Sequence, residues 1–132
     1  MRSRPMRIGA VQLRIMRVLW KHGRATARQI TDELSRERPI AHSTVQTLLR
    51  KLEKKGSVSH TVQGRLFVFR ALVSEEEVMT AATGDLLQRL FDGSVYGLVA
   101  HLVSGERVPP EEMARIRELI TGEGGCDGTG SD

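Results

Sequence analysis

One segment of the sequence, residues 43–56, constrains the fold more than any other because its two faces differ in chemistry. Apolar residues follow the i, i+3, i+4, i+7 spacing of one helical face: Val45, Leu48, Leu49 and Leu52. The opposite face carries hydrogen-bonding and cationic side chains: Ser43, Gln46, Thr47, Arg50, Lys51 and Lys54. The pattern predicts a helix that packs one side into a core and presents the other to a polar partner.

Two further helices are predicted before this segment. Residues 8–22 are apolar on two adjoining stripes and end before Gly23, a residue that favours the position after a helix. One stripe consists of Val11, Ile15, Val18 and Leu19, and the other of Leu13, Met16 and Trp20. Thr26 and Gln29 have the spacing of a capping box, so a helix of two to three turns should begin there. Pro39 lies in the loop that follows it.

A β-hairpin is predicted directly after the third helix. Residues 57–62 and 66–71 both alternate with the period of two that a half-exposed strand shows. Between them Gln63-Gly64 is a hairpin turn signal, because glycine adopts positive φ without steric cost. Three helices followed by two strands predict a mainly α fold with a small β-hairpin, a winged helix-turn-helix domain over residues 8–72.

The carboxy-terminal half is predicted to form short helices that need a partner. Apolar residues recur at helical spacing within residues 74–91, 94–102 and 109–120, and helices of this length are not stable alone. We expect residues 74–121 to be a dimerisation region that pairs with a second copy of the chain. The alternative is that these helices pack back onto their own chain. Residues 122–132 are rich in glycine and should form a disordered tail.

Charge is divided unevenly along the chain. Residues 1–72 contain 16 Lys and Arg against 4 Asp and Glu, whereas residues 73–132 contain 4 against 12, although the whole chain is only +4. A net +12 on one domain favours a polyanionic partner, because without one the domain repels itself. The alternative is two solvated surfaces of opposite sign that attract each other.

These features together predict a DNA-binding surface. In a helix-turn-helix the second helix enters the major groove, where hydroxyl and amide side chains contact bases and cations contact phosphates. The predicted DNA-binding residues are Ser43, Thr44, Gln46, Thr47, Arg50, Lys51, Lys54 and, at the hairpin tip, Arg65. The alternative for each is an ordinary solvated side chain on a helix face or a turn.

Other functional classes find less support in the sequence. The four histidines are far apart and Cys126 is the only cysteine, so we predict no metal site, no cofactor and no enzymatic activity. Three features favour a cytoplasmic protein without membrane insertion. The chain has a lone cysteine, it has no apolar run behind its basic amino terminus, and it has no membrane-spanning segment. The main alternative is a winged-helix protein-interaction module that does not bind DNA; a small hydrolase or metalloenzyme is weaker.

Two stretches of the sequence resemble a known family. These are LRIMRVLWKHGRATARQI, residues 13–30, and AHSTVQTLLRKLEKKGSVSHTVQGRLFVFRALVSEEE, residues 41–77. They are similar to the penicillinase and methicillin-resistance repressors of the BlaI/MecI type, over roughly residues 10–120. The resemblance implies a homodimeric transcriptional repressor that binds a palindromic DNA operator. It implies base contacts from Ser43, Thr44, Gln46 and Thr47, and backbone contacts from Arg50, Lys51 and Arg65.

The resemblance also bears on regulation. In antibiotic-responsive members a membrane-bound sensor protease cleaves the repressor in its dimerisation region, and residues 98–102 are the matching stretch here. A protease-sensitive segment at His101 and Leu102 is the corresponding expectation, although those members have Asn where this chain has His101. Copper-responsive relatives carry a cysteine cluster at the carboxy terminus. This chain has only Cys126, so copper sensing is not implied.

Overall fold

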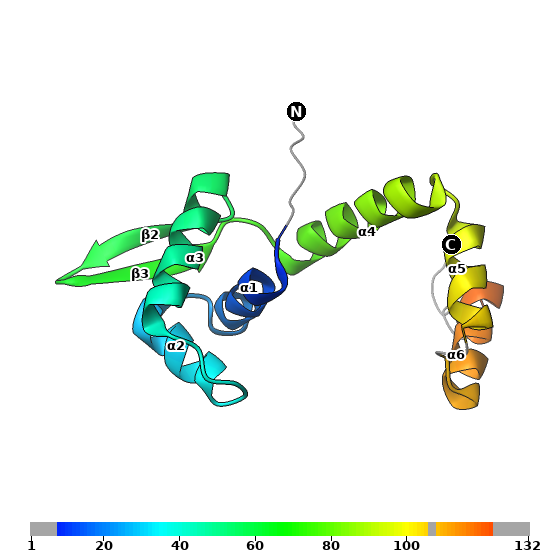
Figure 1. Ribbon diagram of the computed structural model, residues 1–132, viewed down its shortest axis with the longest axis horizontal. Coiled ribbons are helices and arrows are strands. Elements are labelled where there is room, and N and C mark those ends of the chain that lie inside the picture. The colour runs from blue at the N-terminus through cyan, green and yellow to red at the C-terminus, as the bar shows by residue number, and fades with distance from the viewer. Residues whose placement is uncertain (1–7, 106–107, 123–132) are drawn as a thin grey trace. The chain divides into compact units, whose positions relative to one another are not determined.

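A computed structural model describes residues 8–105 and 108–122, in two compact units that divide after Asp85. The first unit contains α1 Ala10–His22, β1 Ala25–Thr26, α2 Ala27–Ser35, α3 His42–Lys55, β2 Val58–Gln63 and β3 Leu66–Ala71 (Figure 1). Helix α4, Glu75–Phe91, begins in the first unit and ends in the second, which also contains α5 Val95–Ser104 and α6 Pro110–Thr121. The predicted fold class, a winged helix-turn-helix followed by helices, is confirmed.

The sheet has one more strand than the sequence analysis predicted. Its order is β1-β3-β2 and both pairings are antiparallel, with Ala25 opposite Phe69 and His60 opposite the same Phe69. The two-residue strand β1 is too short to show an alternating pattern, so sequence alone gives no signal for it. The predicted hairpin turn is present, because Gln63 pairs with Leu66 and Gly64 has a φ of +65°.

The core of the first unit comes from its three helices and the base of the sheet. Its largest fully buried side chains are Ile15, Met16, Leu19, Ile30, Val45, Leu49, Leu52 and Val58. The predicted apolar stripe of α3 is therefore correct at three positions, while Leu48 is half-buried. On α1 the predicted stripe was wrong at Val11, which is 37% exposed. Gln12 is buried instead, since its Oε1 accepts a hydrogen bond of 3.0 Å from the Gly9 amide.

Local sequence signals define where the helices begin and end. The Thr26 hydroxyl accepts from the Gln29 amide at 3.1 Å, and Gln29 Oε1 accepts from the Thr26 amide at 2.8 Å, so the predicted capping box is present. Gly23 and Gly56 follow α1 and α3 with φ of +85° and +88°. In that region a side chain is strained and glycine is not, which explains the abrupt ends of both helices.

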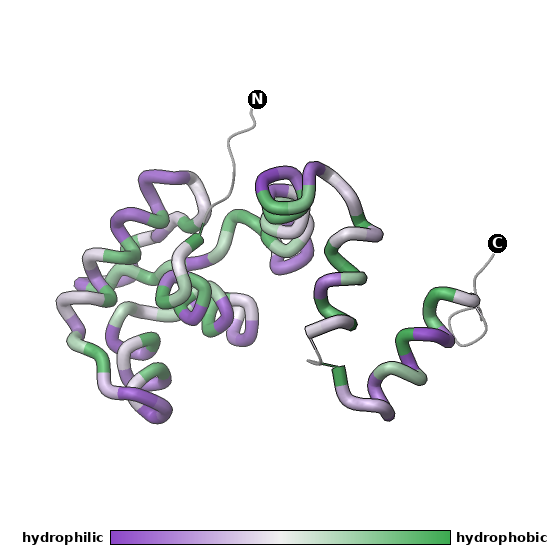
Figure 2. Tube along the Cα trace, turned by 45° about the vertical axis from the view of Figure 1, so that its right-hand side comes forward, coloured by the Kyte–Doolittle hydropathy of each residue, from purple (hydrophilic) through white to green (hydrophobic). Residues whose placement is uncertain are grey.

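The second unit has helices but little buried surface. None of the residues of α5 or α6 is buried, although both helices carry apolar stripes that are evident in Figure 2. Large apolar side chains exposed on α4, α5 and α6 include Met79, Leu90, Val95, Tyr96, Val99, Leu102, Val103, Leu119 and Ile120. Exposed surface of this kind is typical of a segment that is covered by a partner.

Two further expectations concern the carboxy-terminal tail and membrane-spanning segments. The disordered tail was predicted for residues 122–132. Of these only Gly122, the C-cap of α6, is among the described residues, and Cys126 lies outside them. Within the described ranges, none of the helices combines the length and apolarity needed to cross a membrane.

Candidate nucleic-acid interface

The outer face of α3 is open to solvent along its whole length. Every predicted DNA-binding residue on this helix is exposed: Ser43, Thr44, Gln46, Thr47, Arg50, Lys51 and Lys54. Among them the structure records one internal contact, a 3.4 Å hydrogen bond from the Arg50 guanidinium to the Thr47 hydroxyl. The opposite face is anchored by Val45, Leu49 and Leu52, each 0% exposed. A rigid helix therefore presents polar side chains at one end and cations at the other.

The amino terminus of α3 is held in place by α2. The Thr31 hydroxyl lies 2.9 Å from the Ala27 carbonyl oxygen and 2.9 Å from His42 Nδ1, so it links the two helices. The N-cap residue of α3 is Ala41, whose methyl group cannot accept a hydrogen bond from the first turn. The first-turn amides of α3 are therefore not satisfied by a side-chain cap, which suits a phosphate oxygen. Neither Thr31 nor His42 was among the predicted site residues.

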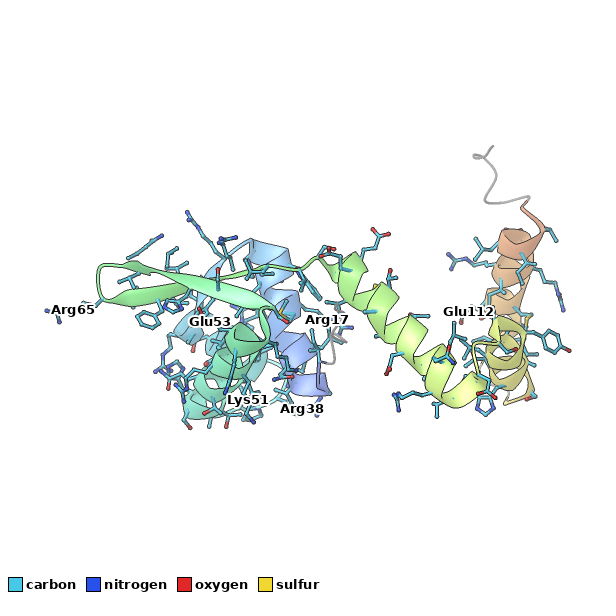
Figure 3. All side chains as sticks on the ribbon, turned by 90° about the horizontal axis from the view of Figure 1, so that it is seen from above. Arg17, Arg38, Lys51, Glu53, Arg65 and Glu112 are labelled. Carbon is cyan, nitrogen blue, oxygen red and sulfur yellow. The ribbon has the colours of Figure 1, made fainter. Side chains whose placement is uncertain are left out.

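The hairpin supplies the eighth predicted residue. Arg65 is exposed and lies at the tip, beside the turn glycine Gly64 (Figure 3). Toward the tip the apolar side chains are exposed to solvent, since Val62 is 62% exposed and Leu66 is 58% exposed. The outer part of the hairpin is therefore a projecting wing that carries one cation at its end.

A contact between α3 and the hairpin was not predicted. The two carboxylate oxygens of Glu53 each lie 2.9 Å from Nδ1 of His60, whose ring stacks on Phe67 at a centroid distance of 4.1 Å. One signal in the sequence could have pointed to it, since Glu53 is the only acidic residue in α3. Its partner could not be found by spacing, because the contact depends on how the hairpin folds over the helix.

Two carboxylates, Glu33 of α2 and Glu37 of the loop after it, pair with cationic side chains of α1. Glu33 contacts both Lys21 at 3.2 Å and His22 at 2.8 Å, and Glu37 lies 3.6 Å from Arg14. The hydrogen bond from His22, helped by Lys21, lowers the pKa of the Glu33 carboxyl below its ordinary value. In the described part of the chain, no carboxylate is within ion-pair distance of Arg50, Lys51, Lys54 or Arg65. These four cations remain available to an external anion.

The predicted protease-sensitive residues lie in the second unit. His101 and Leu102 are exposed and belong to helix α5, and the His101 ring lies 5.9 Å from the ring of Phe91. A protease would have to unwind this helix locally to reach its backbone. Within residues 8–105 and 108–122, no group of three His, Cys, Asp or Glu side chains has a spacing that could hold a metal ion.

Comparison with known proteins identifies relatives along nearly the whole chain. Residues 8–122 match the family model described as Penicillinase repressor. The penicillinase repressor of Bacillus licheniformis is 26% identical over 113 residues, 86% of this chain and 88% of that protein. The methicillin resistance regulatory protein MecI of Mammaliicoccus sciuri is 22% identical over 120 residues, 91% and 98% of the two chains. The solution structure of the DNA binding domain of the repressor BlaI is 34% identical with a TM-score of 0.51, and covers 58% of this chain and 93% of that one.

Proposed function

The chain belongs to the penicillinase repressor family and is a DNA-binding transcriptional repressor rather than an enzyme, and we propose that it binds a palindromic operator as a homodimer. The exposed polar face of α3 is the observation that carries this proposal. In each protomer α3 enters a major groove while the wing lies against the adjacent backbone. The dimer then represses by covering the promoter.

Base contacts are assigned to the amino-terminal half of α3. Ser43, Thr44, Gln46 and Thr47 are exposed there, and their hydroxyl and amide groups can donate to and accept from base edges. The Arg50–Thr47 hydrogen bond directs the guanidinium along the helix surface, next to the groove wall. The amides before Thr44 have no side-chain cap, because Ala41 cannot provide one, so they can donate to a backbone phosphate.

Backbone contacts are assigned to the cations at the other end of α3 and on the wing. Arg50, Lys51, Lys54 and Arg65 are exposed and not paired with a carboxylate in the described structure. Phosphate contacts fix the register of the protein on the duplex without carrying sequence information.

The dimer is assigned to the helices after Val73. Tyr96 is 83% exposed, and Leu119 and Ile120 are each 70% exposed, on helices that have no buried residues of their own. A second copy offers the same apolar surface, so a two-fold interface would cover both at once.

We also propose that the protein acts in the cytoplasm. A membrane-bound sensor protease is the further partner that we propose, acting at His101 and Leu102 once α5 unwinds.

Selection of duplexes from a random-sequence pool, followed by titration at several salt concentrations, tests the proposal. The recovered sequences should share an inverted repeat. About eight phosphate contacts per dimer give a slope of roughly −7 for the logarithm of affinity against that of salt concentration, and a monomer gives about half of this. Binding that is insensitive to salt, or recovered sequences without a shared motif, would contradict the proposal and favour a protein-interaction module.

A further inference from the structure

A carboxylate occupies the helix that we assign to DNA, where its charge opposes binding. Glu53 is the only acidic residue of α3 and lies next to Lys54 and one helical turn from Arg50. DNA is a polyanion, so a negative charge at this place lowers affinity through its electrostatic field unless the residue has another effect. The contacts of Glu53 show what that effect is.

Glu53 contacts the hairpin through a histidine. Both of its carboxylate oxygens lie 2.9 Å from His60 Nδ1, and the two side chains are 34% and 27% exposed. A carboxylate has no proton to donate, so Nδ1 of His60 carries the hydrogen and donates it. The bond therefore connects the carboxy-terminal part of α3 to the middle of β2, and it is partly shielded from water.

His60 also contacts β3, the second strand of the hairpin. Its ring lies nearly parallel to Phe67, with an interplanar angle of 11°, and is tilted against Phe69 at 5.4 Å. Phe69 is directly opposite His60 in the strand register and is 7% exposed, whereas Phe67 lies two residues closer to the tip and is 51% exposed. The stack thus extends outward from the core along the wing.

The outer part of the wing has little packing of its own. Beyond the contact between Glu53 and His60, the hairpin is a two-stranded ribbon whose apolar residues, such as Val62 and Leu66, are more than half exposed. Such ribbons are only marginally stable by themselves, and they twist more strongly than wider sheets do. Arg65, which we assign to the DNA backbone, is carried on this ribbon.

We propose that Glu53, His60 and Phe67 are positioning residues that hold the wing at a fixed orientation to α3. This inference rests on the proposed function, because it explains how α3 and Arg65 bind one duplex together. We call the three side chains the wing clamp. A wing held in place before binding loses less conformational freedom on binding, so the clamp strengthens affinity even though Glu53 is anionic.

The direction in which Glu53→Ala changes the affinity for DNA distinguishes the clamp from the effect of charge alone. Glu53→Ala in the full-length protein should weaken binding about three- to tenfold, measured on a duplex selected by the wild-type protein from a random pool. Loss of the charge alone would strengthen binding. Glu53→Gln keeps an acceptor for His60 without the charge and should bind at least as tightly as wild type. Glu37→Ala is the matched control, because Glu37 is a 78% exposed carboxylate that pairs with Arg14.

Coupling between the clamp and the tip tests the positioning role itself. Arg65→Ala should weaken binding about fivefold or more in the wild-type background and less than about twofold in the Glu53→Ala background. In the free protein, amide order parameters of residues 61–67 measured by NMR should fall in Glu53→Ala and stay at wild-type values in Glu53→Gln and Glu37→Ala.

The outcomes distinguish failure of the clamp from failure of the proposed function. Unchanged wing order parameters in Glu53→Ala, or tighter binding by that variant, would overturn the clamp while leaving α3 as the reading helix. An equal effect of Arg65→Ala in both backgrounds would also overturn it. Failure of the wild-type protein to select any duplex would instead overturn the proposed function, and the wing measurements would still report on the clamp.

Discussion

At the scale of the residue, the exposed side of α3 is divided by chemistry along its length. The hydroxyl and amide groups of Ser43, Gln46 and Thr47 precede the cations of Lys51 and Lys54. Because the helix is anchored by fully buried leucines and a valine on its other side, these groups are held at fixed spacing. Specific recognition needs this rigidity, since each base contact tolerates little displacement.

Thr47→Ala tests base reading. We expect a loss of about 1–3 kcal/mol on the selected duplex and a smaller loss on random duplex, because we assign the hydroxyl and methyl of Thr47 to a base edge and the substitution leaves the assigned phosphate contacts in place. The variant also removes the acceptor of the Arg50 hydrogen bond. Equal losses on the two duplexes, measured by fluorescence anisotropy, would contradict a base-reading role. Lys54→Ala provides the contrast, since a phosphate contact should weaken both duplexes alike.

The Glu33 cluster gives a pH dependence whose sign follows from its contacts. His22 and Lys21 lower the pKa of Glu33 in the folded protein below its ordinary value of 4.5. A lowered pKa means that the stabilisation is present above pH 4.5 and is lost as the pH falls through the folded-state pKa. Urea unfolding should therefore show wild type more stable than Glu33→Gln at pH 6, with the difference shrinking below pH 4.5. A difference that grows with acidification would contradict this assignment.

At the scale of the element, features that depend on neighbouring residues could be predicted from the sequence, whereas features that depend on contacts between distant residues could not. The capping box at Thr26, the glycine after each of α1 and α3, and the hairpin turn could be predicted because each depends on residues within four positions. Strand β1 and the wing clamp could not, because both form only when the hairpin folds onto the helices. The exposed face of α3 was predictable, since the spacing of its apolar residues defines which side is buried.

Thr26→Ala tests how much the capping box contributes to the stability of the first unit. Thr26 is both the N-cap of α2 and part of β1, opposite Val68. Loss of the hydroxyl should lower the free energy of unfolding by about 1 kcal/mol, within a range of 0.5–2. Thr26→Ser keeps the capping oxygen and should recover most of this loss in urea unfolding. If Ser and Ala are equally destabilised, the strand pairing rather than the cap is responsible.

At the scale of the whole molecule, the two halves of the sequence differ in both charge and burial. The basic half contains the fully buried core, whereas the acidic half contains exposed apolar helices. This division is expected when one half binds a polyanion and the other binds a second copy of itself. The order of the helices was predictable from sequence, but the extent of their exposure was not, because exposure depends on packing between residues far apart in the chain.

Leu119→Asp tests the dimer assigned to the second unit. Leu119 is 70% exposed, so a charge there costs the single chain little, whereas a charge buried in an interface is strongly unfavourable. Sedimentation equilibrium should show that the dissociation constant of the dimer rises by at least about tenfold. Ser35→Asp, an equal charge change at the exposed end of α2, is the control and should sediment as wild type. A dimer of unchanged affinity in Leu119→Asp would exclude this part of α6 from the interface.

The most direct test of the account compares two identical charge changes on different helices. Lys51 lies on the exposed face of α3 and Arg17 on the exposed side of α1 (Figure 3). Lys51→Glu should reduce affinity for the selected duplex by about a hundredfold, because a phosphate contact becomes a repulsion; Arg17→Glu changes only the distant field and should cost a few-fold. Equal losses in the two variants, or a larger loss for Arg17→Glu, would contradict the claim that α3 is the helix that reads DNA.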